Sequence, residues 1–547
     1  MADDDAFPTL ADDDVAALAA HGTRRPIRAG DHLYREGDAQ YDFFVILSGA
    51  VEIVTDAGTD HEHLITTHTA GRFLGELNLL TGMRVFVTAR VTEPGEVIAM
   101  SRAELRRVIA TQPKLSDTIL TAFLARRQIL LTGAASAIRV VGSRFSPDTG
   151  QIREFLTRTR IPHEWVDPDA DPDVERLLCE FGVAASELPV VIATGSVLRR
   201  PTSGVLADYL GLTLGSIPER FFDLIVVGGG PAGLAAAVYG ASEGLQTLGV
   251  EMVALGGQAG SSSRIENYLG FPTGISGSDL MQRAFVQAEK FGAYMTAPCA
   301  AMSLREENGH LVVHLSDGTD VVGRAVIVAS GARYRRLDAD GLADFECRGV
   351  YYAATDAEAR MCAGSRVVVV GGGNSAGQAA MFLADSGSDV TICIRGDELG
   401  KSMSRYLVDR IDAHDRIDVR TDTRIAAFAG DESLREVHLS GPDGKNELVP
   451  CAAVFSFIGA DPSSGWLSGC AALDDKGFVL TDRALGAEDL DARWDALQRP
   501  PLPFETSHPG LFAVGDIRSG STKRVAAAVG EGSAAVRSVH EYLAFVG

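Results

Sequence analysis

Residues 223–233 read Asp-Leu-Ile-Val-Val-Gly-Gly-Gly-Pro-Ala-Gly, and an alanine-rich segment follows them. The apolar run at residues 223–227 is typical of a buried parallel strand, and the alanines predict a helix. Gly228 permits the tight turn between them, Gly230 leaves room for a pyrophosphate, and Gly233 lets the helix pack closely on the strand. The helix N-terminus adds free N–H groups that favour a phosphate.

Two further features indicate dinucleotide binding. Glu251 closes an apolar run at residues 245–250, at the roughly 20-residue spacing that brings an acid to a ribose hydroxyl. A second strand and turn follow at residues 366–380, where Ala376 takes the place of the third glycine. Two such sites in one module predict a flavin and a pyridine nucleotide, between which a hydride passes.

The composition indicates a folded protein of several domains. Its 547 residues, 46% of them hydrophobic, suffice for roughly three to four domains. The formal charge of −23 opposes affinity for nucleic acids and anionic membranes. The seven cysteines occur singly, the acidic N-terminus lacks the features of a signal peptide, and no apolar run approaches ~18 residues. We therefore expect a cytoplasmic protein without a nucleic-acid partner, membrane span or metal centre.

Short apolar runs separated by glycines between residues 28 and 100 predict an antiparallel barrel or jelly roll. Residues 35–38 (Arg-Glu-Gly-Asp) and 71–77 (Gly-Arg-Phe-Leu-Gly-Glu-Leu) make this segment resemble a cyclic-nucleotide-binding domain. The resemblance implies that Gly75 and Glu76 lie at the ligand's ribose and that an arginine further on clamps its phosphate.

The phosphate contact is the doubtful part of this resemblance. If Thr88 aligns with the threonine of that family, Val85 occupies the arginine position. Arg84 lies one residue early, which in an extended segment turns it to the other face. Phe86 and Val87 are larger than the residues that usually make room for the ligand. We take Gly75, Glu76 and Arg84 as candidate effector residues, and leave cyclic-nucleotide binding open.

Apolar residues at helical spacing between residues 101 and 131 predict helices that break at Pro113. They would serve as a dimerising helix, as in the family, or pack against their own barrel or the next domain. Next, residues 137–142, 164–167 and 189–194 predict strands, and residues 149–158 and 172–181 predict helices. This unit resembles a glutaredoxin or thioredoxin, with Pro189 at the place of the family's cis-proline. Residues 146–149 (Ser-Pro-Asp-Thr) stand at the redox motif and contain no cysteine, which favours a docking or spacer role.

From about residue 217 onward the chain resembles low-molecular-weight thioredoxin reductases. The resemblance is carried by residues 223–233, 256–258 (Gly-Gly-Gln), 265–272 and 511–516 (Leu-Phe-Ala-Val-Gly-Asp). It implies FAD, NADPH and a homodimer. The residues expected at the two cofactors are Gly228, Gly230, Pro231, Ala232, Gly233, Glu251, Gly257, Gln258, Asn267, Gly331, Gly371, Gly373, Asn374, Ser375, Ala376, Arg395, Gly515, Asp516, Lys523, Arg524 and Val525.

The choice of nicotinamide donor depends on basic residues after the second strand of the second site. Arg395 stands at the first arginine of the family's His-Arg-Arg run and would hold a 2′-phosphate. Lys401 and Arg405 would assist it or form a solvated face. The pattern favours NADPH, with NADH as the alternative.

Residues 353–356 read Ala-Ala-Thr-Asp, where the reductase family has Cys-Ala-Thr-Cys. Both cysteines of the resembling motif are therefore replaced, by Ala353 and Asp356. Cys347 and Cys362 do not reproduce a pair at a strand-to-helix turn. Asp356 would be either a proton donor beside the flavin or the cap of a helix.

These patterns predict a multidomain α+β and α/β protein. The expected units are a β jelly roll with C-terminal helices (1–134), a thioredoxin-like domain (135–215), an FAD domain (216–337 with 460–547) and an inserted NAD(P)H domain (338–459). The function is either an FAD-dependent, NAD(P)H-oxidising enzyme with an unknown acceptor other than thioredoxin, or a sensor that signals through its N-terminal domains. Steady turnover of reduced nicotinamide separates the two.

Overall fold

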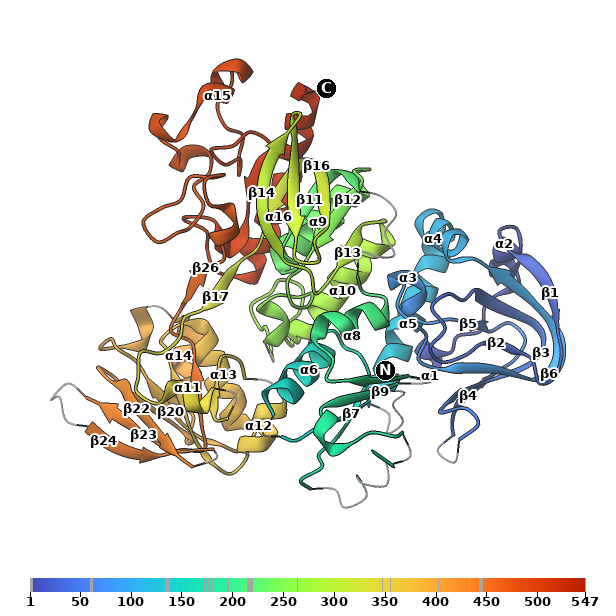
Figure 1. Ribbon diagram of the computed structural model, residues 1–547, viewed down its shortest axis with the longest axis horizontal. Coiled ribbons are helices and arrows are strands. Elements are labelled where there is room, and N and C mark those ends of the chain that lie inside the picture. The colour runs from blue at the N-terminus through green and yellow to red at the C-terminus, as the bar shows by residue number, and fades with distance from the viewer. Residues whose placement is uncertain are drawn as a thin grey trace.

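The structure is a computed structural model in which four units are visible in Figure 1, the first of them the blue N-terminal barrel. It describes residues 3–59, 62–132, 138–144, 146–170, 174, 178–179, 181–193, 196–213, 220–262, 264–346, 348–354, 356–401, 403–431, 433–441 and 446–546. Residues 3, 4, 132, 356 and 357 are described by their backbone alone.

The N-terminal unit is a curled antiparallel sheet, as the glycine-punctuated pattern predicts. Its strands run in the order β1-β6-β3-β4, with β2 on β6 and β5 on β3. The strands are β1 (Thr23–Ile27), β2 (His32–Tyr34), β3 (Phe43–Thr55), β4 (His63–His68), β5 (Phe73–Leu74) and β6 (Thr88–Met100). The helices are α1 (Asp3–Ala6), α2 (Asp12–Ala19), α3 (Asn78–Thr81), α4 (Arg102–Thr111) and α5 (Pro113–Thr132). Phe43, Phe73 and Phe123 join the sheet to α5 in one buried cluster, so α5 packs against its own barrel.

The second unit is a small four-stranded sheet in the order β10-β9-β7-β8. Strands β7 and β8 are parallel, whereas β9 is antiparallel to both β7 and β10. Its elements are β7 (Ile138–Val141), α6 (Pro147–Arg158), β8 (Glu164–Val166), β9 (Val190–Ala193), β10 (Ser196–Arg199) and α8 (Ser203–Leu210). The helix expected at residues 172–181 lies largely outside the described residues.

The third unit contains the parallel strands that the opening sequence predicts. Its sheet has the order β13-β12-β11-β16-β15-β14, with β27 on β16. The strands are β11 (Phe221–Val227), β12 (Thr247–Val250), β13 (Tyr294–Thr296), β14 (Ala301–Glu307), β15 (His310–Leu315), β16 (Asp320–Val328) and β27 (Leu511–Ala513). The helices are α9 (Pro231–Ser242), α10 (Gly277–Lys290), α15 (Ala492–Leu497) and α16 (Val525–Val546). Strand β27 pairs with β16, so the C-terminal segment completes a sheet that begins with β11, almost 300 residues earlier in the chain.

The fourth unit is inserted into the third. The chain enters it after β17 (Ala332–Tyr334) and returns through β26 (Ala460–Pro462), and these two strands pair with each other. A parallel sheet has the order β18-β25-β19-β20-β21, and β22-β23-β24 form an antiparallel sheet. The strands are β18 (Val350–Tyr351), β19 (Arg366–Val370), β20 (Asp389–Cys393), β21 (Ile417–Arg420), β22 (Arg424–Gly430), β23 (Leu434–Ser440), β24 (Asn446–Pro450) and β25 (Ala453–Ser456). The helices are α11 (Leu342–Phe345), α12 (Asp356–Cys362), α13 (Asn374–Asp385) and α14 (Arg405–Asp412). Within the described parts of all four units, no helix combines the length and apolarity that crossing a bilayer requires.

Candidate dinucleotide sites and effector pocket

The first glycine turn joins β11 to α9, and its geometry explains each glycine. Gly228 has φ +118°, and a Cβ there would lie 2.1 Å from a backbone carbonyl oxygen. A Cβ at Gly233 would lie 1.8 Å from the Gly228 oxygen, so a larger residue cannot fit between helix and strand. At Gly230, by contrast, the nearest atom to a Cβ would be 3.8 Å away. A side chain at residue 230 would thus contact the Gly257 backbone and stand in front of the N-terminus of α9, where such turns bind a pyrophosphate.

The carboxylate of Glu251 lies beside this turn. One oxygen accepts a hydrogen bond from Gly229 N at 2.7 Å, and the other accepts one from Val253 N at 3.0 Å. A carboxylate oxygen has more than one lone pair, so Glu251 retains acceptor capacity for a ribose hydroxyl. The expected acid is thus held at the turn by the backbone.

Two later segments meet the first turn of α9. A Cβ at Gly257 would lie 2.9 Å from Gly230 Cα, and one at Gly515 would lie 2.9 Å from Ala232 Cβ. Gln258 donates from Nε2 to the Ala332 carbonyl. The structure therefore brings residues 228–233, 256–258 and 515–516 together at the N-terminus of α9, as the sequence predicts.

The segment around Asp516 is partly buried and charged. Burial raises the pKa of Asp516, Lys523 opposes this and Glu531 adds to it. Lys523 Nζ donates to the Asp516 carbonyl at 2.9 Å, Arg524 is exposed, and Val525 begins α16. Basic and acidic groups thus converge at this end of the site.

Two other expected cofactor residues lie in loops. Asn267 is exposed. Its neighbour Glu266 forms an ion pair with Arg410 on α14, at 2.7 Å. Gly331 has φ +64° and lies between β16 and β17. Because glycine adopts a positive φ most easily, the backbone conformation alone explains why residue 331 is a glycine.

The second glycine turn joins β19 to α13. Gly371 has φ +139°, and a Cβ there would lie 2.4 Å from a backbone oxygen. A Cβ at Gly373 would meet nothing within 4 Å, so open space faces a helix N-terminus. Asn374 Oδ1 accepts a hydrogen bond from a backbone N–H at 2.7 Å, Ser375 is exposed and Ala376 is fully buried. The alanine therefore occupies the close-packing position of the third glycine.

The candidate 2′-phosphate residues differ in their partners. Lys401 forms an ion pair with Asp397 at 2.5 Å, and Arg405 forms one with Asp409 at 2.8 Å. Arg395 is exposed just after β20 and has no ion-pair partner in the part of the chain that the structure describes. Of the three, Arg395 is the cation best placed to accept a new anionic partner.

Residues 353–354, where the sequence resemblance expects the start of a dithiol motif, lead toward α12. Ala354 is buried, and α12 begins at Asp356, whose side chain lies outside the described residues. The choice between a proton donor and a helix cap at Asp356 therefore stays open. Cys362, at the end of α12, is 3% exposed, and burial raises its thiol pKa to about 11. Such a thiol is not a reactive nucleophile near neutral pH, and Cys347 lies outside the described residues.

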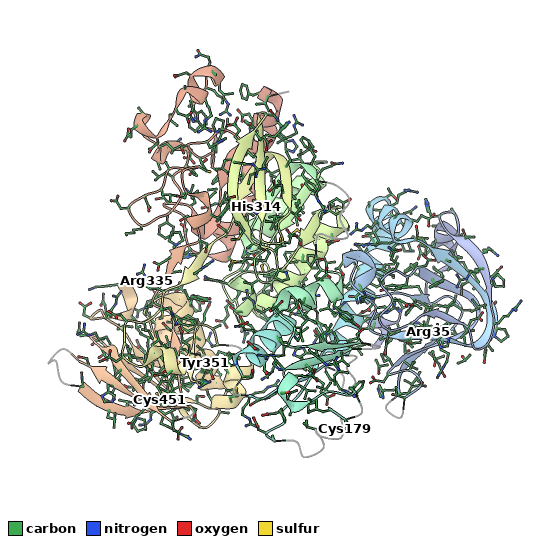
Figure 2. All side chains as sticks on the ribbon, viewed as in Figure 1. Arg35, Cys179, His314, Arg335, Tyr351 and Cys451 are labelled. Atoms are coloured by element: carbon green, nitrogen blue, oxygen red, sulfur yellow. The ribbon has the colours of Figure 1, made fainter. Side chains whose placement is uncertain are left out.

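The remaining described cysteines form no disulfide. Cys179 is exposed in the second unit and Cys451 is buried in the fourth, and Figure 2 labels both. Burial raises the thiol pKa of Cys393 and of Cys451 to about 12. Every described cysteine is a free thiol, so the described residues offer no dithiol pair at a glycine turn.

A pocket of about 420 Å³ lies in the N-terminal barrel unit. Gly75 and Glu76 lie in its wall, and Glu76 is 4% exposed. Glu76 Oε1 accepts hydrogen bonds from Asn78 Nδ2 at 3.0 Å and from Phe86 N at 3.3 Å. Burial raises the pKa of Glu76, and Arg127 opposes this. The glutamate expected at a ligand thus lies in the pocket and is partly satisfied within it.

Arg84 does not line this pocket. Its Nε donates to the Tyr209 carbonyl at 2.5 Å and its guanidinium lies 5.0 Å from the Tyr209 ring, in the second unit. Val85 is buried in the barrel core instead. Arg84 thus points away from this pocket and toward the second unit, and its role at an effector stays a prediction.

The sequence reasoning missed Arg126. This residue of α5 is buried and lines the pocket. Its guanidinium donates to the carbonyls of Ala6, Phe73 and Gly75 at 2.6 to 3.1 Å. Burial lowers the pKa of its guanidinium to about 10. The available signal was a pair of adjacent arginines within a helix whose apolar residues predict burial.

Comparisons with known proteins agree with this architecture. The profile of the pyridine nucleotide-disulphide oxidoreductase family matches residues 222–532, and that of the cyclic nucleotide-binding domain matches residues 24–112. A thioredoxin reductase of Listeria innocua is 30% identical over 329 residues, covering 59% of this chain and 95% of that protein. One of Treponema pallidum is 32% identical over 327 residues, covering 59% and 98%.

Solved structures give the same result. The thioredoxin reductase of Lactococcus lactis is 26% identical, with a TM-score of 0.53, and the match covers 59% of this chain and 99% of that one. The thioredoxin reductase of T. acidophilum has the same identity and TM-score, with coverage of 60% and 100%. The two glycine turns and the family match over residues 222–532 define a two-dinucleotide oxidoreductase module. The chain belongs to the pyridine nucleotide-disulphide oxidoreductase family, and carries a cyclic nucleotide-binding domain at its N-terminal end.

Proposed function

We propose that this protein is an FAD-dependent enzyme that oxidises NADPH, with NADH as a second donor, and reduces an acceptor other than thioredoxin. The observation that carries the proposal is the pair of glycine turns, which place Gly230 and Gly373 as the N-cap residues of α9 and α13. A hydride-transferring flavoprotein needs two such sites in one module. The relatives named as thioredoxin reductases support the cofactor pair.

The residues at the first turn fit the ADP half of FAD. The N–H groups of α9 can bind a pyrophosphate, Glu251 can accept from a ribose hydroxyl, and Gly257 closes the turn. Asp516 and the segment 523–525 are proposed to hold the rest of the cofactor. When bound, FAD supplies the hydride-accepting ring. The second turn, with Arg395 beside it, is proposed to hold the nicotinamide nucleotide.

The proposed acceptor follows from the residues at the start of α12. Ala353 has no nucleophile, and a carboxylate at Asp356 cannot undergo thiol–disulfide exchange. Cys362 is buried, with its thiol pKa raised to about 11. These residues favour direct reduction of a small acceptor at the flavin over transfer through a protein dithiol.

The second unit is proposed to be a thioredoxin-like domain with a docking or spacer role. Two observations support it: the order β10-β9-β7-β8, and the position of Ser146 and Thr149 at the start of α6. Gly142 lies against both Thr149 and Pro189, and the Leu188–Pro189 peptide is cis. We propose the domain limits 1–134, 135–215, 216–337 with 460–547, and 338–459, and a homodimeric cytoplasmic protein.

An anaerobic titration tests the enzyme proposal. Purified protein should be yellow, and its absorbance near 450 nm should bleach with one equivalent of NADPH. Quinones, disulfides and oxygen are then added in turn while NADPH consumption is recorded. Continuous consumption with one of these acceptors is expected. A protein that bleaches once and then consumes no NADPH with any acceptor would contradict an enzymatic role.

A regulatory role is the second candidate, and a specific contact favours it. Arg127 Nη2 donates to Asn78 Oδ1 and lies 3.8 Å from Glu76 Oε2, while its Nη1 donates to the Arg160 carbonyl at 3.3 Å. The barrel pocket is therefore connected to the second unit. If a cyclic nucleotide is the effector, cAMP or cGMP should change the rate of NADPH oxidation in the wild type and have no effect in E76Q.

A further inference from the structure

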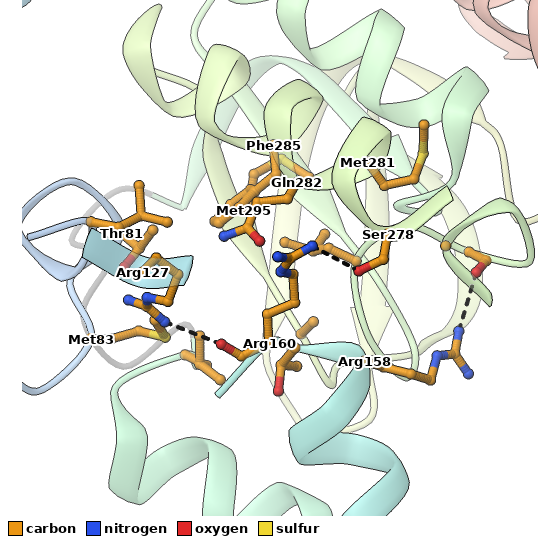
Figure 3. Close-up of a pocket in the computed structure, with 17 residues that line it drawn as sticks. Thr81, Met83, Arg127, Arg158, Arg160, Ser278, Met281, Gln282, Phe285 and Met295 are labelled. Atoms are coloured by element: carbon orange, nitrogen blue, oxygen red, sulfur yellow. Dashed lines mark hydrogen bonds between the residues drawn. The ribbon is translucent and has the colours of Figure 1, made fainter. Parts of the chain in front are cut away.

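A cavity lies where the barrel, the second unit and the FAD unit meet, and it is separate from the barrel pocket. It encloses about 870 Å³, part of it open to solvent. Figure 3 shows Arg127 from α5, Arg158 and Arg160 from the end of α6 and the loop after it, and Ser278 and Gln282 from α10 around this space. Small-molecule sites often lie at such junctions between domains.

The lining combines apolar surface with cationic groups. Its apolar side chains are those of Leu77, Met83, Leu212, Met281, Phe285 and Met295, among others. Three arginines line the cavity, whereas no carboxylate residue does among those that form its described wall. Arg158 is the least committed arginine, because its contacts to Glu154 and to the Gly257 carbonyl are both 3.4 Å long.

Three polar atoms in this wall lack a hydrogen-bond partner within the described parts of the chain. They are Thr81 Oγ1, Arg127 Nε and Arg160 Nε, and all three are buried. A buried donor without an acceptor costs about 1–3 kcal/mol, so such groups usually have a partner. The barrel unit contributes Thr81 and Arg127, and the second unit contributes Arg160. The unpaired polar atoms of two units therefore line one cavity.

The cavity shares a wall with the first dinucleotide site. Gly257 abuts Gly230 on one side, while its carbonyl accepts from Arg158 Nη2 on the other. Arg160 donates to Ser278 Oγ at 3.1 Å and to Asp279 Oδ1 at 2.5 Å, at the start of α10. A molecule that binds Arg158 or Arg160 would therefore change the hydrogen bonds that these arginines make to Gly257 and to the start of α10.

We propose that this junction is a binding site for a small organic anion with an apolar or aromatic body. Arg158 and Arg160 would hold the anionic group, and the methionines, leucines and Phe285 would cover the apolar part. The site is additional to the two dinucleotide sites and the barrel pocket. A bound molecule would affect the expected flavin-binding turn through Gly257, which contacts both Arg158 and Gly230, and would not occupy the turn itself.

Calorimetric titration of the FAD-loaded protein tests the site, with excess FAD and NADP⁺ present so that both glycine turns are filled. The probes are 8-anilinonaphthalene-1-sulfonate and the uncharged N-phenyl-1-naphthylamine, which share the ring system and differ in the sulfonate. We expect the sulfonate to bind at least about tenfold more tightly, as a charge-assisted hydrogen bond provides. R158Q should remove most of that preference. R283Q, an exposed arginine on α10 outside the cavity, should retain it.

Q282W tests the location, because the indole would fill the cavity from α10 and should remove one binding site for both probes. A297F should remove the same site from the opposite wall, and flavin content shows that each variant is folded. Equal affinity for the two probes, an unchanged preference in R158Q, or full binding in both folded filling variants would overturn the proposal. No binding of either probe to the wild type, which a cavity that holds only water would give, would also overturn the proposal.

Discussion

Arg410 on α14 and Glu266, next to Asn267, form an ion pair of 2.7 Å between the two nucleotide-binding units. These units are otherwise connected by the paired strands β17 and β26. The pair thus links the fourth unit to the third at a point beside the expected flavin contact. Its side chains are 42% and 23% exposed, which limits its contribution to stability.

Charge reversal should therefore change the arrangement more than the stability. R410E and E266R should each change the rate constant of flavin reduction by NADPH by up to about fivefold, since an exposed pair contributes at most about 1 kcal/mol. The double variant E266R/R410E restores an opposite-charge pair and should return the rate to that of the wild type. Stopped-flow absorbance near 450 nm measures it. A double variant no closer to wild type than the singles would show that the pair has no such role.

Substitutions at Gly230 should grade the binding of FAD. G230A adds a methyl group whose nearest neighbour is 3.8 Å away, so the variant should fold and lose only part of its flavin. G230D places a carboxylate against the pyrophosphate and should purify without flavin, because like charges meet at the helix N-terminus. Flavin absorbance per mole of protein measures both. Full flavin in folded G230D would place FAD elsewhere.

The donor preference should depend on Arg395. R395A should raise the KM for NADPH about 10- to 150-fold, which corresponds to the roughly 1.5–3 kcal/mol of a charged hydrogen bond, and leave the KM for NADH nearly unchanged. K401A and R405A are the controls, since both cations already have carboxylate partners. Steady-state kinetics with either donor measure the effect. Equal losses for NADPH and NADH in R395A would place the 2′-phosphate elsewhere.

A buried acid of α10, which faces Arg106 of the barrel unit, should make stability depend on pH. Burial raises the pKa of Glu289 to about 7, against the lowering effect of Arg106 and Arg102, and Arg106 lies 2.6 Å away. Because the pKa is higher in the folded state, the stabilisation is complete below the unfolded pKa of 4.5 and is lost as pH rises through about 7.

The variant E289Q cannot ionise, so it provides the reference. Between about pH 5 and pH 8, the unfolding free energy of the wild type should fall relative to that of E289Q, by up to about 3 kcal/mol. Thermal midpoints across this range measure the difference. The exposed E307Q should show no such trend relative to the wild type. Parallel curves for wild type and E289Q would mean that Glu289 keeps its charge throughout.

Local constraints explain what the sequence could predict. The strand, turn and helix at residues 221–242 could be predicted because their geometry accommodates only glycine at residues 228 and 233. The outward turn of Arg84 follows from the alternation of an extended segment. Both predictions use residues within a few positions of one another, where sequence spacing determines which side chains share a face.

Contacts between distant segments could not be predicted in this way. Arg127 meets the Arg160 carbonyl, and Arg160 meets Asp279 more than a hundred residues further on. Neither contact leaves a periodic signal, because each depends on how separately folded units pack. The junction cavity exists only where these units meet, so no single motif indicates it.

The protein should not reduce thioredoxin, although two relatives that it resembles are named thioredoxin reductases. Reduction of a protein disulfide requires thiolate attack by a sulfur at a defined place. Ala353 and Asp356 provide none, and residues 146–149 of the second unit contain no cysteine. Cys362 is buried, with its thiol pKa raised to about 11, so it too is a poor nucleophile.

The assay should use thioredoxin itself with NADPH, because free reduced flavin can react with artificial disulfides. A C347S/C362S variant should behave as the wild type does, with no thioredoxin reduction and unchanged flavin content. Reduction at ordinary enzyme rates, on the order of 1 to 1,000 per second, would contradict the proposed acceptor class. If the double variant then lost that activity, Cys347 or Cys362 would be the sulfur responsible, and their single variants would show which one.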